Sequence, residues 1–183
     1  MIQVLKFLLL PLFIITLISC NTDKKEQEPA DYAFFPELTL KDGAYYKNGE
    51  DVPFTGTSGS TYSTGDPYVH ADFEEGKMDG KYSAYYSNGT KMGESTYSKG
   101  ELDGLSESWH DNGNKASEIH FEEGLRQGKL TTYYPSGLIY TEGYFVDGNL
   151  DSTYTRWNRD GEIEFASTYD NGELIESNPA DSL

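Results

Sequence analysis

The chain has 183 residues, the length of a single domain, and its 31 acidic and 14 basic side chains give a formal net charge of −17. This excess of negative charge repels phosphate backbones and anionic lipid head groups, so it argues against nucleic-acid binding and against membrane binding through a basic patch. The single cysteine excludes an internal disulfide.

Residues 1–19 are predicted to be a signal peptide. Lys6 precedes an apolar run from Phe7 to Ile18, which is shorter than the roughly 20 residues of a membrane-spanning helix and has the size of a signal-peptide core. The run ends in four residues that resemble the lipobox of bacterial lipoproteins: Leu17, Ile18, Ser19 and Cys20. This resemblance implies cleavage before Cys20 and a lipid on its thiol and new amino group. The alternative is an ordinary secreted protein with an unused cysteine.

Residues 20–39 are predicted to be the lipidated cysteine and a flexible tether. The stretch from Asn21 to Asp31 is charged, contains a proline and has no apolar periodicity, which is typical of a chain that does not pack. Its charged start resembles the sorting signals of some Gram-negative lipoproteins, although a plain tether explains it too. The prediction is a membrane-anchored lipoprotein of the bacterial cell envelope, in the outer membrane, on its periplasmic or its surface side.

The rest of the chain repeats with a period of 24 residues, which indicates a repeat architecture. Five full repeats are predicted at 56–79, 80–103, 104–127, 128–151 and 152–175, after a partial repeat at 40–55 and before a frayed tail at 176–183. Terminal repeats are often atypical because they cap the array, which explains the partial one.

Two columns of glycine mark the turns of each repeat. Gly89 and Gly137 each follow a polar pair or a Pro-Ser pair, and a glycine at a recurring turn favours a positive φ. Pro135 fixes a negative φ and so excludes a type I′ turn at its position, whereas a type I turn followed by a left-handed glycine and a G1 bulge fits all copies. Two turns per repeat leave one strand of roughly 5–7 residues in each half, so the unit is a β-hairpin.

The predicted fold is all-β: an elongated, twisted, single-layer meander of antiparallel hairpins, with a closed β-barrel as the alternative. Side chains two apart share a sheet face, and positions 91, 93, 95 and 97 place Lys91 on the same face as the aromatic column of Tyr97. This face is predicted to be packed. The opposite face carries a glutamate column of Glu94, Glu118 and Glu142, which either binds a cation or a basic protein or is simply solvated.

A second aromatic column contains Tyr85, Trp109, Tyr133 and Trp157. In the adjacent pairs of tyrosines, one ring is predicted to be core and the other, Tyr86 or Tyr134, to be exposed or half-exposed. Exposed rings of this kind bind peptides or sugars, or they pack between neighbouring repeats. Three histidines are predicted to lie on the surface, and none has the spacing of a metal site: His70, His110 and His120.

The segments Tyr85 to Gly89 and Glu94 to Gly100 read Tyr-Tyr-x-Asn-Gly and Glu-x-x-Tyr-x-x-Gly. They resemble the MORN repeat (membrane occupation and recognition nexus) in its bacterial variant, and the resemblance extends over about residues 40–175. It implies a scaffold, and the YwqK-like group of such proteins is labelled as antitoxins, which implies a protein partner. Three residues depart from the pattern and predict weaker repeats at the ends: Ser152, Ala166 and His70.

No Ser-His-Asp, Cys-His or phosphate-loop pattern is present, so the sequence predicts a protein without enzymatic activity, metal or cofactor. The expected function is a protein-binding or scaffold module at the envelope, with a partner that is basic if the glutamate column is its site. An antitoxin that neutralises a toxin by binding and a glycan-binding module are the alternatives.

Overall fold

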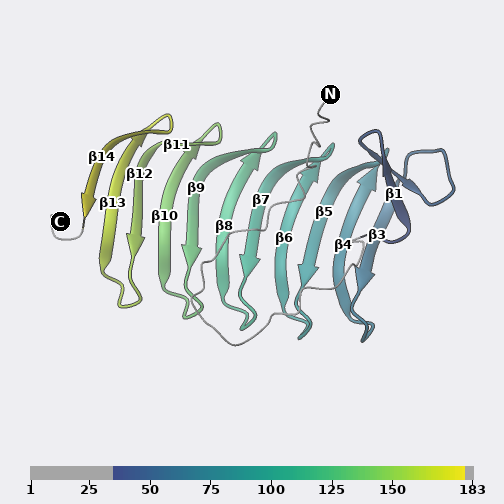
Figure 1. The fold of residues 1–183 in the computed structure, drawn as a ribbon, viewed down its shortest axis with the longest axis horizontal. Helices are drawn as coiled ribbons and strands as arrows, with labels where there is room; N and C mark the ends of the chain where they lie inside the picture. Colours follow the sequence, from purple (N-terminus) through teal and green to yellow (C-terminus); the bar gives the residue numbers. More distant parts are fainter. Residues whose placement is uncertain (1–34, 180–183) are drawn as a thin grey trace, which may run out of the picture. The chain divides into compact units, whose positions relative to one another are not determined.

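The computed structural model describes residues 35–179, and within them it contains strands and turns but no helix. β1 (Leu38–Lys41) and β2 (Ala44–Lys47) form a small antiparallel sheet, and twelve strands form a second one (Figure 1). These twelve strands are β3 (Gly56–Thr61), β4 (Pro67–Glu74), β5 (Lys77–Tyr85), β6 (Lys91–Ser98), β7 (Glu101–Trp109), β8 (Lys115–Glu122), β9 (Leu125–Tyr133), β10 (Ile139–Val146), β11 (Asn149–Leu150), β12 (Ser152–Trp157), β13 (Ile163–Asp170) and β14 (Glu173–Pro179).

Each strand of the large sheet pairs with its neighbours in the sequence, so the predicted antiparallel hairpin meander is confirmed. The order runs from β3 to β14 without a crossover, and β11 pairs with β10 beside β12. β3 and β14 are the two edges and do not pair with each other within the described residues, so the sheet is open and the closed alternative is wrong.

The signal peptide, the lipobox from Leu17 to Cys20, most of the tether and the last four residues lie outside the described part of the chain. Within residues 35–179, no helix has the length and apolar character needed to cross a membrane.

The turns at one end of the hairpins have the predicted geometry. Gly89 has a φ of 83°, its N–H donates to the carbonyl of Tyr86 at 2.9 Å, and the ladder shifts register at Tyr85. The turn at Pro135 is built in the same way, because Gly137 donates to the carbonyl of Tyr134 at 2.8 Å. These are type I turns with a G1 bulge.

The turns at the other end are different and contain only two residues. Lys99 and Gly100 both have a positive φ, of 51° and 92°, which is the type I′ geometry that suits the twist of a tight hairpin. The N–H of Gly100 donates to the carbonyl of Met78 in the preceding hairpin at 2.8 Å. The same bond recurs at Gly76, Gly124, Gly148 and Gly172. This turn therefore closes one hairpin and attaches it to the hairpin before it.

The packed face of the sheet combines aromatic rings with small hydroxyl side chains. Tyr82 and Tyr97 are each 5% exposed and meet edge to face at 6.1 Å. Pairs of hydroxyls bridge neighbouring strands beside them: Ser95 with Ser106 at 2.7 Å, Ser108 with Ser117 at 2.6 Å, and Thr132 with Thr141 at 2.6 Å. The rings supply the apolar burial, and each hydroxyl pair satisfies two polar atoms that would otherwise be buried alone.

Residues 35–54, which combine the end of the predicted tether with most of the partial repeat, close the N-terminal end of the core. Phe35, Tyr45 and Phe54 surround Phe73, with ring centroids 5.0, 5.2 and 5.7 Å from it. Tyr45 donates its N–H to the carbonyl of Gly76 at 2.7 Å. The β1–β2 hairpin therefore buries the first aromatic ring of the repeated column.

The ladder is irregular between the fourth and fifth repeats. Ser152 stands where the other full repeats open with glycine, and it has a φ of 69°. β10 and β12 share only two pairs, Thr141 with Arg156 and Glu142 with Thr155. The pair of Gly143 with Tyr154, which would correspond to Ser95 with Ser106, is absent from the described ladder. The equivalent pair of Ile119 with Leu130 is absent between β8 and β9 too, and the N–H of Asp151 donates to the carbonyl of Tyr144 at 2.8 Å, so the chain stays hydrogen-bonded to β10 on both sides of this point.

Replacement of Lys99 by Asn is expected to raise the free energy of unfolding by about 0.5–1 kcal/mol, because Asn tolerates the left-handed conformation better than Lys does. Urea unfolding of the wild type and the variant measures the difference. Lys99→Gln is the matched control, since it removes the same charge without the conformational preference. Equal stability of the Asn and Gln variants would contradict the type I′ assignment.

Candidate functional site

One face of the sheet carries both the second aromatic column and the ion-paired lysines and glutamates of β6–β10, and we call it the charged aromatic face. Its four rings, one from each of four successive hairpins, are Tyr85, Trp109, Tyr133 and Trp157. All four are half-buried, so the prediction that Tyr85 and Tyr133 belong to the core is wrong. Corresponding rings of adjacent hairpins are two strands apart, a distance of about 9.6 Å.

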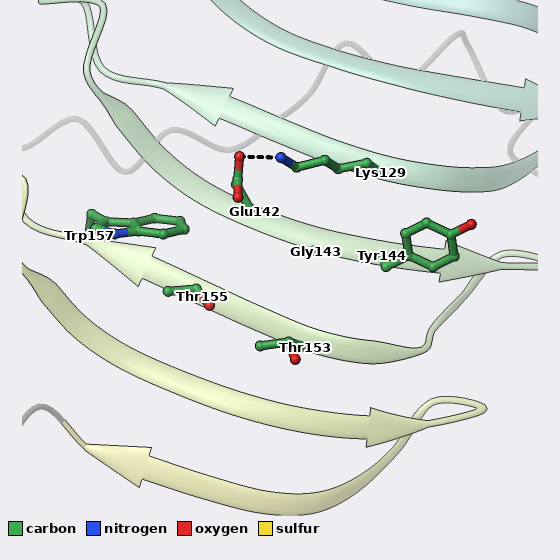
Figure 2. A pocket seen from close by; sticks show the side chains of 7 residues that line it. All are labelled: Lys129, Glu142, Gly143, Tyr144, Thr153, Thr155 and Trp157. Atoms are coloured by element: carbon green, nitrogen blue, oxygen red, sulfur yellow. Dashed lines mark ion pairs between the residues drawn. The ribbon is translucent and has the colours of Figure 1, made fainter. Parts of the chain in front are cut away.

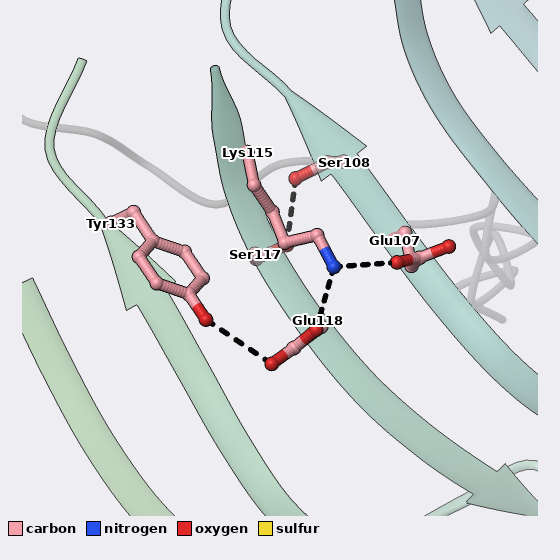
Figure 3. A network of polar contacts seen from close by, with 6 residues as sticks. All are labelled: Glu107, Ser108, Lys115, Ser117, Glu118 and Tyr133. Atoms are coloured by element: carbon pink, nitrogen blue, oxygen red, sulfur yellow. Dashed lines mark hydrogen bonds and ion pairs between the residues drawn. The ribbon is translucent and has the colours of Figure 1, made fainter. Parts of the chain in front are cut away.

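The glutamate column is paired with lysines along this face. Lys115 lies 2.7 Å from both Glu107 and Glu118, and the hydroxyl of Tyr133 donates to Glu118 at 3.1 Å (Figure 3). Lys91 lies 2.7 Å from Glu94, and Lys129 lies 2.6 Å from Glu142. The column is thus a set of ion pairs and not an uncompensated row of negative charge.

The pKa values reflect this pairing. The hydrogen bond from Lys91 lowers the pKa of the Glu94 carboxyl, and the bond from Lys115 does the same for Glu118. The pKa of the Lys115 ammonium is raised by its hydrogen bonds to Glu107 and Glu118. Each carboxylate stays charged at neutral pH because its partner stabilises the ionised form.

The predicted face is wrong for Lys91. Strict alternation places Lys91 with Tyr97 on the packed face, whereas its Nζ lies 2.7 Å from Glu94 on the opposite one. The cause is the register shift between the pairs Ala84–Gly93 and Tyr85–Lys91. A bulge inserts one residue and reverses the alternation beyond it. The G1 bulge predicted from the sequence implies this reversal of faces.

Tyr86 and Tyr134 lie between neighbouring hairpins. The hydroxyl of Tyr86 donates to the carbonyl of Trp109 at 2.9 Å, and that of Tyr134 donates to the carbonyl of Trp157 at 2.8 Å. Tyr62 makes the corresponding bond to Tyr85 at 2.7 Å. Both candidate residues are half-buried, so these bonds favour the alternative in which the rings pack between repeats.

His110 occupies the same column and replaces the tyrosine. It is only 8% exposed, and its Nε2 lies 2.9 Å from the carbonyl of Tyr133. A carbonyl only accepts hydrogen bonds, so Nε2 carries the proton. The predicted surface position is wrong for His110 and right for His70 and His120, which are exposed.

A hollow of about 290 Å³ lies on the charged aromatic face over β9, β10 and β12. Trp157 and Tyr144 stand at its two ends, with the Lys129–Glu142 ion pair between them on one side and the β12 threonines on the other (Figure 2). Its lining residues are Lys129, Glu142, Gly143, Tyr144, Thr153, Thr155 and Trp157. Within residues 35–179, no three His, Cys, Asp or Glu side chains are grouped to hold a metal ion.

Two segments of the chain, residues 78–99 and 102–123, match the family model of the MORN repeat variant. No curated protein matches the chain. Among solved structures, it is similar to a mutant of S. aureus TarM crystallised with fondaparinux, α-GlcNAc-glycerol and UDP, at 12% identity and a TM-score of 0.33 over 53% of this chain. It is also similar to another TarM crystal structure, at 14% identity and a TM-score of 0.33 over 57% of this chain. The chain spans about a fifth of the length of these proteins, 19% and 20%.

Replacement of Tyr134 by Phe is expected to lower the free energy of unfolding by about 0.5–1.5 kcal/mol, because the carbonyl of Trp157 loses its donor while the ring remains. Urea unfolding measures the loss. Tyr144→Phe is the control, since Tyr144 is 47% exposed and belongs to another column. Equal, negligible effects in both variants would show that the Tyr134 bond adds no stability.

Proposed function

We propose that this chain is a non-catalytic module that binds another protein and acts as a scaffold. The match of two repeats to the MORN repeat variant favours a protein- or membrane-binding module, and the net charge of −17 favours a protein over an anionic membrane surface. Histidine and glutamate side chains, which enzymes often use in catalysis, make structural bonds here. His110 bonds to the neighbouring backbone, and Glu118 is paired with Lys115.

The proposed binding surface is the regular part of the charged aromatic face, over β5–β9. The observation that carries the proposal is the row of half-buried rings at Tyr85, Trp109 and Tyr133, set among charges that are already paired. Aromatic anchors dominate the energetics of protein interfaces. Paired charges impose a smaller desolvation cost than isolated ones, and they select a partner of complementary alternating charge over a uniformly basic one.

The proposed location is the bacterial cell envelope, where the lipid on Cys20 anchors the repeats to the outer membrane. The support is the sequence: an apolar run of signal-peptide size that ends in Leu17, Ile18, Ser19 and Cys20. Several acyl chains give stable membrane attachment, whereas one is marginal.

Mass spectrometry of the mature N-terminal peptide is expected to find it beginning at Cys20 with lipid on the thiol and amino group. Detergent phase partitioning is expected to place the wild type in the detergent phase and Cys20→Ala in the aqueous phase or in an uncleaved form. A wild-type N-terminal peptide without lipid would overturn the lipoprotein proposal, whether it begins at Cys20 or at another residue.

Affinity capture from solubilised envelopes is expected to lose its specific partner when Tyr85 and Trp109 are both replaced by Ala, because the anchoring rings are removed. Exchanging the charges of one pair, Lys91→Glu with Glu94→Lys, is expected to weaken capture at least about tenfold while it keeps the ion pair and the fold.

The control for this experiment is Tyr46→Ala, which removes a ring from the β1–β2 hairpin outside the face, and thermal unfolding verifies that each variant is folded. Identical captured proteins in all variants would overturn the charged aromatic face as the binding surface. A toxin among the proteins lost with the face would identify the antitoxin form of the proposed function.

A further inference from the structure

The hollow between β10 and β12 differs from the rest of the charged aromatic face. Over β5–β8 the face has one ring and one or two ion pairs per hairpin. At the hollow Tyr144 stands where β6 and β8 carry Thr96 and His120, so a second ring joins the surface beside the Lys129–Glu142 ion pair. The hollow goes beyond the proposed protein-binding function and does not depend on it.

The side chains around the hollow offer two kinds of contact at once. Trp157 is half-buried and Tyr144 is 47% exposed, so each presents an apolar ring surface. Between the rings, Lys129 supplies donors and Glu142 supplies acceptors, held 2.6 Å apart. Thr153 and Thr155 supply hydroxyls from the facing strand.

This combination excludes several classes of ligand. Glu142 is the only carboxylate in the lining and is bound to Lys129, so a metal ion lacks ligands. Lys129 is the only cation, and its charge is compensated, so a phosphate lacks a counter-charge. A purely apolar ligand would bury the ion pair and the threonine hydroxyls without hydrogen bonds.

We propose that the hollow is a binding site for a neutral pyranoside sugar. A pyranose ring has an apolar face of C–H groups that stacks on an aromatic ring, and a rim of hydroxyls that both donate and accept hydrogen bonds. A paired lysine and glutamate satisfy adjacent hydroxyls in both roles. A volume of about 290 Å³ accommodates one or two sugar rings and lies near the lower limit of small-molecule sites.

The aromatic column extends this site along the sheet. Corresponding rings such as Tyr133 and Trp157 are about 9.6 Å apart, two strand spacings, which is close to the length of a disaccharide unit in an extended β-linked chain. The hollow therefore holds the principal sugar, and the neighbouring rings of the row contact alternate units of a longer oligosaccharide.

The test uses the two tryptophans of the chain as separate reporters. In the full-length protein, Trp109→Phe leaves Trp157 as the only tryptophan, and Trp157→Phe leaves Trp109. Chitotetraose, cellotetraose and maltotetraose are the probes. Titration is expected to give a saturable change of Trp157 emission with at least one β-linked probe, and calorimetry on the wild type gives its Kd.

Trp157→Ala is expected to weaken that binding about tenfold through the lost stacking. The second variant, Thr153→Val with Thr155→Val, preserves shape and tests the hydroxyls without removing a ring; it is expected to weaken binding too. Tyr85→Ala is the control outside the hollow and leaves the Kd for the tetrasaccharides within about twofold.

Absence of a saturable response with every probe would overturn the sugar site. Binding that is unchanged in both hollow variants, or that is lost in Tyr85→Ala and retained in Trp157→Ala, would overturn its location. Protein capture depends on Tyr85 and Trp109, so the sugar site and the proposed function fail or succeed separately.

Discussion

The structure depends on a single constraint: a one-layer sheet has no second layer to hold its hairpins together, so each hairpin must be bonded to the next at both ends. At one end, the glycine of each two-residue turn in the large sheet donates to a carbonyl of the unit before it, as Gly100 does to Met78 at 2.8 Å. At the other end, Tyr86 and its equivalents donate to the following hairpin. The repeat is conserved along the chain in those two columns because they carry the coupling between units.

This constraint explains what could be predicted. The strands, the hairpin order and the first class of turn follow from the glycine spacing and from Pro135, because local steric rules decide them. Which side chains lie on each face of the sheet could be predicted only in part. Alternation holds from Gly93 to Tyr97, but the bulge before Gly93 reverses it, and Lys91 lies with Glu94 instead of with Tyr97. Assigning faces by odd and even residue numbers fails at a bulge, because the bulge adds a residue to one strand that has no partner in the other.

The candidate site was predicted less well for a related reason. Glu94, Glu118 and Glu142 do share one face, yet each is paired with a lysine. The bulges place Lys91 and Lys115 there, and the regular β9–β10 ladder places Lys129. His110 was assigned to the surface because a single histidine gives no sign of burial, whereas its column does: the tyrosines at that position all donate to a backbone carbonyl. Reading the residue by its column, and not by its type, predicts the observed bond.

Ser152 replaces the glycine that opens the other full repeats and keeps a positive φ, of 69°. A positive φ at a serine costs stability, and the prediction was a weaker terminal repeat. The ladder nevertheless continues on both sides of Ser152: Glu142 pairs with Thr155, and the N–H of Asp151 donates to the carbonyl of Tyr144 at 2.8 Å. A perfectly regular array presents the same flat surface at every hairpin and therefore cannot enclose a small molecule. A hollow therefore needs a departure from the repeated side chains, and on this face the departure is Tyr144, which stands where β6 and β8 carry Thr96 and His120. Together with Trp157 it gives the hollow two aromatic rings.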